Sequence, residues 1–344
     1  MADQVKNTLE DIDNYEQSLN ATLAVIHLYR YDRSSSSIDS SIKKWFGKEM
    51  NPGEVTPDVL IQLSEKRGVI IELKRSFPRN SDGTDRDLWE EDFKQLKSYD
   101  ADLTGWETPN GKISEQDLIL LTSQKVCIEV IDYITNKKLN FADFSKSFSV
   151  WQFNPAPGIK QAVFLQKMYG EITDYKEIRN EDLRRGVTIA LDYLFVSGLS
   201  KVKFLDYEPN IVYLMSLMWD FIFSRMPTDD DWRRINDGGK QIIEIPITVE
   251  QIKEISRNFT LEGHSGLSNE LIRTAMEKFI EIKLAKRGKN GAYVIKYRKK
   301  IKDNQGDENK HKVFAELLFK DGIQTNLPDD KENDEENSEE DDEE

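Results

Sequence analysis

The sequence has almost no cysteine, few histidines and no long apolar run. Of its 344 residues only Cys127 is a cysteine, so no internal disulfide can form and a reducing, cytoplasmic compartment is expected. The three histidines are too scattered for metal-ligand spacing. The longest apolar run, residues 211–223, is interrupted by Asp220 and is too short to cross a bilayer, so we expect a soluble protein without membrane contact.

A G-x-x-x-x-G-K-[ST] motif is also missing, so any ATP-driven translocation would need a separate partner. Acidic residues outnumber basic ones, 63 to 48, so the formal net charge is −15. Most of this charge lies in the segment 321–344, which has thirteen acidic residues and one lysine, a net of −12, and leaves about −3 for the rest. Such a tail cannot form a core, so we expect it to be disordered. The acidic pI therefore does not exclude nucleic acid as a partner.

The order of apolar patterns predicts an α/β domain over residues 1–157. Period-3.6 patterns indicate helices at 8–31, 87–99 and 125–138, and short apolar runs indicate strands at 58–63, 69–75, 117–123 and 148–155. The resulting order, α, β-hairpin, α, β, α, β, is typical of a mixed sheet flanked by helices. Residues 158–240 are expected to be mainly helical and to end in a polar loop at 227–240.

Residues 241–302 show a compact pattern of strand, helix, helix and hairpin. Thr248 followed three residues later by Gln251 predicts a capped helix start, and Asn290-Gly291 predicts a hairpin turn. This order is the outline of a winged helix-turn-helix, a DNA-binding element. Residues 303–344 are expected to form a C-terminal extension that includes the acidic tail.

The stretch "TPDVLIQLSEKRGVIIELKRSFP", residues 56–78, places charged residues inside two strand-like runs. A hairpin centred on Lys66 would set Asp58 opposite Lys74 and diagonal to Glu72, and a shift of register by two keeps these side chains on one face. The odd positions 59–63 and 69–73 are all apolar and form a core face. The charged residues therefore gather on the other face.

Two carboxylates held close together suit a hard divalent cation. Mg²⁺, or Mn²⁺, prefers a few carboxylate oxygens together with water and phosphate, which makes Asp58 and Glu72 candidate metal ligands. Lys74 is two residues from Glu72, where an ammonium group can orient a water and stabilise charge on a phosphate. These residue types indicate phosphodiester hydrolysis.

The "PD" at 57–58 and "ELK" at 72–74 resemble the PD-(D/E)xK nuclease superfamily, and "QLKSY" at 95–99 is similar to the Q-x-x-x-Y motif of RecB-like and type I restriction nuclease domains. The resemblance covers roughly residues 8–155 and implies a restriction-endonuclease-like fold. It implies that Asp58 and Glu72 bind metal, that Lys74 is catalytic, and that Gln95 and Tyr99 support the site. A glutamate on the first helix is also implied, with Glu16 preferred and Glu10 available.

The basic hairpin near the C-terminus is the second functional feature. Residues 283–302 contain nine Lys or Arg and no acidic residue, more than is needed to protect an edge strand. We expect DNA backbone contacts from this hairpin and the helix before it. The candidate residues are Arg273, Lys278, Lys286, Arg287, Lys289, Lys296 and Arg298.

Three functions remain open at the level of sequence. The favoured one is a Mg²⁺-dependent nuclease acting on double-stranded DNA, for which the resemblance implies prokaryotic defence or DNA repair. The alternative is a non-catalytic regulatory protein that binds DNA through the winged helix, with the nuclease fold as a scaffold. The third is an interaction protein assembled through the acidic tail and the helical middle. A homodimer or a partner protein is compatible with each of them.

Overall fold

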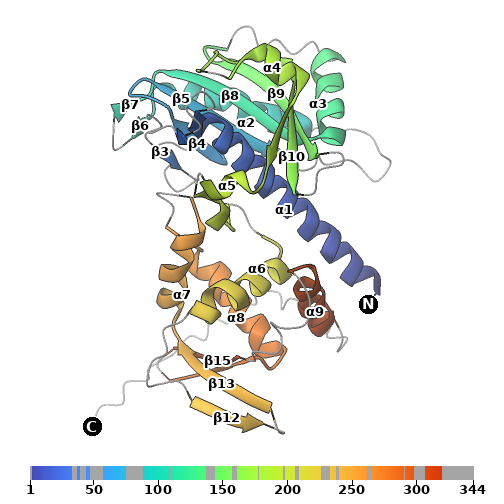
Figure 1. Cartoon of the computed structure of the whole chain (residues 1–344), viewed down its shortest axis with the longest axis vertical. Helices are drawn as coiled ribbons and strands as arrows, with labels where there is room; N and C mark the ends of the chain where they lie inside the picture. Colours follow the sequence, from blue (N-terminus) through green and yellow to red (C-terminus); the bar gives the residue numbers. More distant parts are fainter. Residues whose placement is uncertain are drawn as a thin grey trace, which may run out of the picture.

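Figure 1 shows the computed structural model as two lobes joined by one long helix. The upper lobe is built on a large sheet, and the lower lobe combines short helices with a second sheet. The structure describes residues 2–32, 37–38, 44–46, 57–74, 88–108, 111–136, 144–156, 161–176, 178–196, 198–205, 209–225, 233–237, 240–261, 265–289, 291–297 and 307–319. No helix within these ranges is long and apolar enough to cross a membrane.

Seven strands form the sheet of the upper lobe, in the order β11-β10-β9-β8-β5-β4-β3. The three central strands β5, β8 and β9 are parallel to one another, and the outer strands pair antiparallel. The expected mixed sheet is therefore confirmed. The strands are β3 (Lys44–Phe46), β4 (Val59–Gln62), β5 (Arg67–Lys74), β8 (Glu115–Ser123), β9 (Ser147–Pro155), β10 (Ala162–Gly170) and β11 (Val187–Ala190).

Helices cover both faces of this sheet. The odd-numbered residues of the β4–β5 hairpin, such as Val69 and Ile71, join a core cluster with α1 (Ala2–Arg30). The even-numbered Ile70 joins a second cluster with α2 (Leu88–Asp102) and α3 (Gln124–Asn136). The expected sorting of the hairpin by face is confirmed, and the lobe has three layers.

The hairpin register differs from the expected one. Val59 pairs with Ile71, and Gln62 with Gly68, so the turn is centred on Glu65 rather than Lys66. The Ser64 hydroxyl accepts hydrogen bonds from the backbone N–H groups of Lys66 and Arg67 and closes this turn. Because the register shifts by two, the faces are unchanged.

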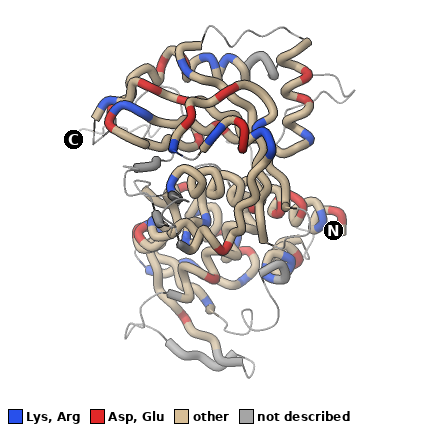
Figure 2. The backbone as a smooth tube through the Cα atoms, turned by 45° about the horizontal axis from the view of Figure 1, so that its top comes forward, with Lys and Arg blue, Asp and Glu red and all other residues tan. Residues whose placement is uncertain are grey.

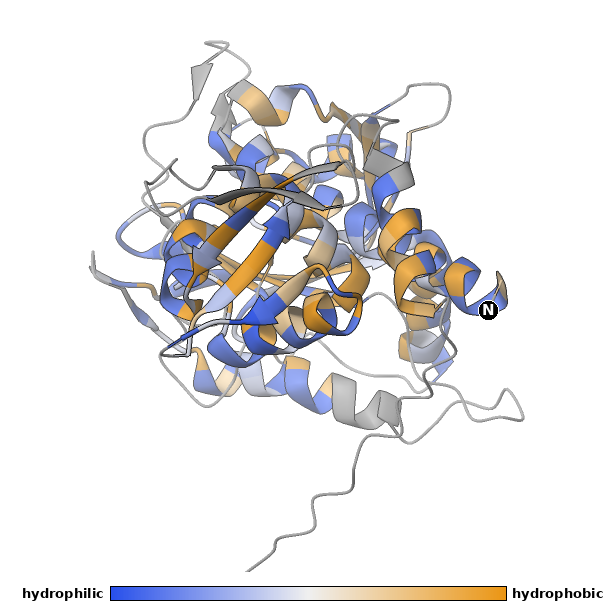
Figure 3. Cartoon of the chain, turned by 90° about the horizontal axis from the view of Figure 1, so that it is seen from below, coloured by the Kyte–Doolittle hydropathy of each residue, from blue (hydrophilic) through white to orange (hydrophobic). Residues whose placement is uncertain are grey.

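The lower lobe contains the predicted strand, two helices and hairpin. β13 (Lys240–Ile247) leads into α7 (Val249–Ser256) and α8 (Asn269–Glu281), and β14 (Ala285–Arg287) and β15 (Tyr293–Tyr297) follow. The predicted capping box of Thr248 and Gln251 is present. Asn290 of the predicted hairpin turn lies outside the described residues. The next residue, Gly291, has φ +75°. Buried residues alternate along β15, and Figure 3 shows both hydrophobic and hydrophilic residues on the strands of the lower lobe.

The expectation of a mainly helical segment at 158–240 is wrong. β10 and β11 extend the large sheet beyond residue 157, so the predicted domain boundary cuts through it. A β-bulge between Lys167 and Tyr169 disrupts the alternation along β10, which explains the error. Within the predicted polar loop, β12 (Arg233–Asp237) pairs with β13. Helix does occur later, as α4 (Asn180–Arg185), α5 (Tyr193–Val196), α6 (Ile211–Leu217), the π-helix η3 (Met218–Ile222) and η4 (Phe223–Arg225).

The sequence patterns also missed α9 (Asp307–Phe319), which lies against α1 and α6. Phe314 and Ala315 are fully buried there, and the Phe314 ring packs on Trp219 and Phe279. The main core cluster is continuous from α1 through the large sheet to α9, so the two lobes share one core. The predicted acidic tail lies outside the described residues. The smaller elements are β1 (Tyr31–Asp32), β2 (Ser37–Ile38), β6 (Glu107–Thr108), β7 (Gly111–Lys112), η2 (Leu199–Lys201) and η5 (Arg257–Phe259).

The end of β10 depends on a glycine. Gly170 has φ +68°, and a Cβ added there would lie 2.0 Å from the carbonyl oxygen of Phe148 on the neighbouring strand. Gly291 has a similar φ of +75°, but nothing lies within 4 Å of its added Cβ. Gly291→Ala should cost about 1–2 kcal/mol for the left-handed backbone alone. Gly170→Ala should cost at least about 2 kcal/mol more, because β9 must move. Chemical denaturation of both variants measures this difference, and equal losses would contradict the close approach.

Candidate functional site

The candidate site lies at the end of the β4–β5 hairpin, where β5 finishes beneath α2. Glu72 and Lys74 alternate with apolar residues and lie on the face that α2 covers. Asp58 directly precedes β4, and its carboxylate oxygen accepts a hydrogen bond of 2.7 Å from the backbone N–H of Leu73. Where the backbone pairing of β4 and β5 ends, this side-chain oxygen accepts the hydrogen bond of a β5 backbone N–H group. Asp58 thus lies beside the segment that carries Glu72 and Lys74, but the observed register continues to Glu72 as its opposite residue, not to Lys74 as predicted.

Four side chains close a ring of polar contacts in this place. The Lys74 ammonium lies 3.1 Å from Glu72 Oε1 and donates to Gln95 Oε1 at 3.1 Å. The Gln95 amide donates to the Tyr99 hydroxyl at 2.5 Å, and this hydroxyl donates to Glu72 Oε2 at 2.8 Å. Each donor in the ring meets an acceptor. The ring holds the Glu72 carboxylate and the Lys74 ammonium in fixed orientations.

Burial distinguishes the members of the ring. The side chain of Glu72 is only 5% exposed, and that of Lys74 is 17% exposed, so part of the lysine side chain reaches solvent. Tyr99 is fully buried, and burial raises its pKa well above the usual value, with further increases from the charge and hydrogen bond of Glu72 and from the charge of Asp58. The hydroxyl therefore remains a hydrogen-bond donor. The effect of Asp58 also indicates that this carboxylate lies within electrostatic range.

Helix α2 is held against the sheet by Asp100, the residue after Tyr99. Its carboxylate accepts hydrogen bonds from the backbone N–H groups of Ser145 and Lys146, just before β9. The Lys146 ammonium donates to the Asp100 carbonyl at 2.6 Å. Burial lowers the pKa of Lys146, whereas the nearby Asp100 charge raises it. These contacts fix the turn of α2 that carries Gln95 and Tyr99.

The donor set suits a hard cation that keeps water ligands. No group of three or more His, Cys, Asp or Glu side chains is arranged as metal ligands within the described ranges. Mg²⁺ commonly binds through one or two carboxylates, with water and substrate phosphate as the other ligands. Asp58 and Glu72 provide such a pair on adjacent chain segments, both nearly buried. The residues present therefore fit a Mg²⁺ or Mn²⁺ ion without a third carboxylate.

Glu16 does not join this site, contrary to the expectation. It lies on α1, and its carboxylate is 3.7 Å from Nε2 of His311 on α9. Glu10, the other candidate, forms an exposed pair with Lys6. α1 covers the opposite face of the sheet from α2, which separates both glutamates from Glu72. The partner of Glu16 lies nearly three hundred residues away, so the sequence pattern gave no signal for it.

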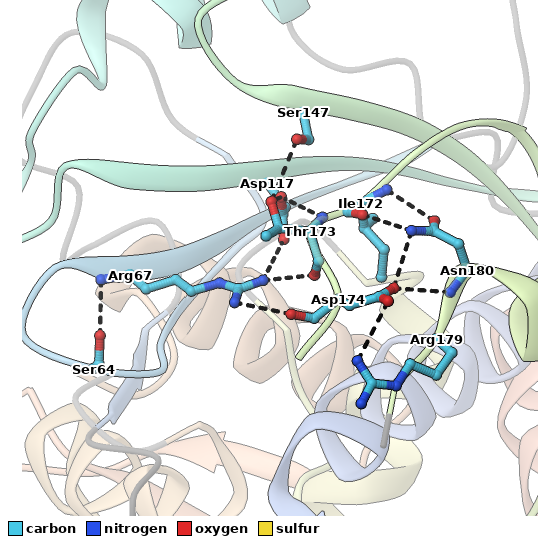
Figure 4. Close-up of polar contacts among 9 residues, drawn as sticks. All are labelled: Ser64, Arg67, Asp117, Ser147, Ile172, Thr173, Asp174, Arg179 and Asn180. Carbon is cyan, nitrogen blue, oxygen red and sulfur yellow. Dashed lines mark hydrogen bonds and ion pairs between the residues drawn. The ribbon is translucent and has the colours of Figure 1, made fainter. Parts of the chain in front are cut away.

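A second polar cluster lies at the opposite ends of the parallel strands (Figure 4). The Asp117 carboxylate accepts hydrogen bonds from the backbone and hydroxyl of Thr173 and contacts the Arg67 guanidinium. Arg67 also donates to the carbonyl oxygens of Thr173 and Asp174. Burial raises the pKa of Asp117, while the Thr173 hydrogen bonds and Arg67 lower it. This cluster joins the segment after β10 to the starts of β5 and β8. It therefore stabilises the fold.

The candidate DNA-contacting residues divide into two groups. Lys278, Lys286 and Arg287 each pair with an acidic residue, namely Glu281 at 2.7 Å, Glu244 at 2.5 Å and Glu277 at 3.0 Å. Arg273 on α8 and Lys289 in the hairpin loop are exposed, and Lys296 is half-buried. Arg298 lies outside the described residues. Acidic and basic segments are intermixed over both lobes (Figure 2), so the predicted basic face is partly neutralised.

The comparisons with known proteins add no assignment. No family model, no curated protein and no solved structure matches the chain.

The ring predicts a measurable coupling between two side chains. Removing the Tyr99 hydroxyl leaves a buried carboxylate without one of its donors, and neutralising Glu72 removes the charge that this donor serves. A cycle of Glu72→Gln, Tyr99→Phe and the double variant should give a coupling of about 1.5–3 kcal/mol in the free energy of unfolding.

Chemical denaturation measures this coupling. The matched control pairs Glu72→Gln with Tyr297→Phe in the lower lobe, for which additive effects are expected. Additivity in the Glu72–Tyr99 cycle would mean that the hydrogen bond does not contribute.

Proposed function

We propose that the chain is a metal-dependent nuclease of the PD-(D/E)xK type that hydrolyses phosphodiester bonds of double-stranded DNA. The observation that carries this proposal is the polar ring of Glu72, Lys74, Gln95 and Tyr99 beside Asp58. A solvated surface pair of Glu72 and Lys74 would not need the buried Tyr99 and the half-buried Gln95 to orient it. A restriction-endonuclease-like fold is part of the proposal, supported by the hairpin, the parallel central strands and the helices on both faces.

Each residue has a distinct part in the proposed reaction. A divalent ion held by Asp58 and Glu72 would supply positive charge to the scissile phosphate and lower the pKa of a bound water. Lys74, whose side chain is partly exposed, can donate from its ammonium group to a phosphate oxygen where negative charge develops. Gln95 and Tyr99 are positioning residues, because they touch Lys74 and Glu72 and hold them in place. Their contribution is pre-organisation.

The lower lobe supports DNA as the substrate. The strand β13 pairs with β15, which pairs with β14, and α7 and α8 lie between them in the chain. This order of elements supports a winged helix-turn-helix as part of the proposal, in which the second helix would enter the major groove and the hairpin would contact the backbone. α8 exposes Asn269, Arg273 and Thr274, residue types that bind bases and phosphates, together with the acidic Glu270.

Cleavage assays test the catalytic part of the proposal. Lys74→Ala should reduce Mg²⁺-dependent cleavage of DNA by about 10²–10⁴-fold, because the phosphate loses a positioned cation. Lys97→Ala removes an exposed lysine from α2 and should leave the rate unchanged. Linear, circular and single-stranded DNA and RNA serve as substrates, with Mg²⁺, Mn²⁺ or EDTA.

Cleavage that survives in EDTA or in Lys74→Ala would refute this mechanism. Tight DNA binding in EDTA without cleavage in any metal would instead favour the regulatory alternative, in which the lower lobe binds DNA and the upper lobe is a scaffold.

DNA binding has its own electrostatic prediction. Arg273→Ala should weaken binding and reduce the slope of log K against log salt by about 1, as for the loss of one phosphate contact. Glu277→Gln should strengthen binding, because it releases Arg287 from its ion pair. Fluorescence anisotropy over a salt series in EDTA measures both changes. Lys125→Ala, on α3 of the upper lobe, is the control. Equal affinities for all four proteins would exclude the α8 surface from DNA contact.

A further inference from the structure

A cavity at the junction of the two lobes is lined by charged side chains that the proposed nuclease site does not use. It has a volume of about 390 Å³ and lies where α1 meets α6, η3 and α9, and we call it the junction cavity. Glu16 of α1 and His311 of α9 form one charged pair in its wall. Asp220 of η3 and Lys310 of α9 form another, at 2.5 Å. Elements from distant parts of the chain therefore build this wall together.

Two polar atoms of the wall lack a hydrogen-bond partner. Oδ1 of Asp220 and Nδ1 of His311 are buried, and neither is paired within the described part of the chain. The two side chains are 10% and 8% exposed. Buried polar atoms are almost always paired in folded proteins. These atoms indicate that a polar partner from outside the protein completes the wall.

Lys203 gives the junction cavity an additional positive charge. Each carboxylate of the wall lies beside a cation, whereas the Lys203 ammonium lies over the Phe221 ring, 5.4 Å from its centre. Among the described residues this ammonium has no carboxylate partner, and its side chain is half-buried. A half-buried ammonium without a counter-ion attracts an anion, and lysine is a common ligand of phosphate. The junction cavity therefore suits an anionic group.

A second cavity adjoins the first and has an uncharged lining. Its volume is about 280 Å³, and Asn20, Gln161 and Leu191 line both cavities. Gln17 and Asn154 complete a set of four amide side chains, none of which forms a hydrogen bond within the described ranges. Amides both donate and accept, which matches the edge of a nucleobase. We call this space the amide cavity.

We propose that the two cavities together bind one nucleoside phosphate. The phosphate lies in the junction cavity beside Lys203, and the base lies in the amide cavity. Asn20 lies between the two parts, because it is one helical turn from both Glu16 and Gln17 on α1. The ligand contacts the large sheet through β9 and the lower lobe through η3 and α9, so its binding stabilises the junction of the lobes. This proposal does not depend on nuclease activity.

Calorimetric titration of the full chain with nucleoside monophosphates in EDTA tests the site. EDTA removes the metal through which the candidate catalytic site would bind a phosphate. One nucleotide per chain should bind, more tightly than inorganic phosphate or the nucleoside alone. Lys203→Met should weaken nucleotide binding about tenfold or more, because a charged hydrogen bond is lost, and should leave the affinity for the nucleoside unchanged. Lys203→Arg keeps the charge and should retain most of the affinity.

Lys201→Met is the matched control, because Lys201 is an exposed lysine that lines neither cavity. It should leave the affinity unchanged, as should Lys74→Ala at the candidate catalytic site. Asn20→Ala is an independent variant and should weaken the binding of nucleotide and nucleoside about tenfold. Circular dichroism checks that each variant keeps the fold. A wild type that binds no nucleotide, inorganic phosphate that binds as tightly as any nucleotide, or equal affinities of Lys203→Met and Lys201→Met would overturn the proposal.

Discussion

The polar ring at the end of β5 is the constraint on which the arrangement of the upper lobe depends. Glu72 is a nearly buried carboxylate, and a buried charge is tolerated only with partners that compensate its loss of water. Lys74 supplies charge, and Tyr99 supplies a hydrogen bond from the opposite layer. α2 must therefore lie at one height and one rotation over the sheet. Asp100 secures that position through the chain before β9.

The two polar clusters of the sheet lie at opposite ends of the parallel strands. The cluster around Asp117 lies where the parallel strands begin, and it joins a loop to the sheet through Arg67. The ring around Glu72 lies towards the carboxyl ends of the same strands. In open α/β sheets, ligands bind outside those ends. Both clusters contain a buried carboxylate and a cation whose side chain is 17% exposed, so their position along the strands is what distinguishes them.

Local patterns in the sequence predicted much of the site. The alternation of apolar residues at 59–63 and 69–73 sorted the hairpin by face, and the spacing of Gln95 and Tyr99 set them one helical turn apart. The register was wrong by two residues, because the turn sequence Ser64-Glu65-Lys66 lacks the strong signal of Asn-Gly. β10 was missed for a different reason, since the bulge near Lys167 interrupts its alternation. These local errors did not change which side chains were predicted to form the site.

Local sequence patterns could not predict contacts between segments that are distant in the chain. Glu16 has the right residue type and a helical position, yet only the fold decides that α1 places it beside His311. The same holds for the ion pairs that neutralise Lys286 and Arg287, because their partners Glu244 and Glu277 belong to other elements. A run of basic residues in the sequence therefore overstated the positive charge on that face.

The contact between α1 and α9 has a consequence for the order of folding. α1 packs against the large sheet and also against α9, which follows it much later in the chain. During translation α1 is synthesised well before α9, so part of its apolar surface stays uncovered until residues 307–319 leave the ribosome. Contacts of such sequence separation slow folding, because the long loop must close before they form. The packing of α9 on α1 should therefore form late in folding. Until then, a chaperone can bind the exposed apolar surface of α1.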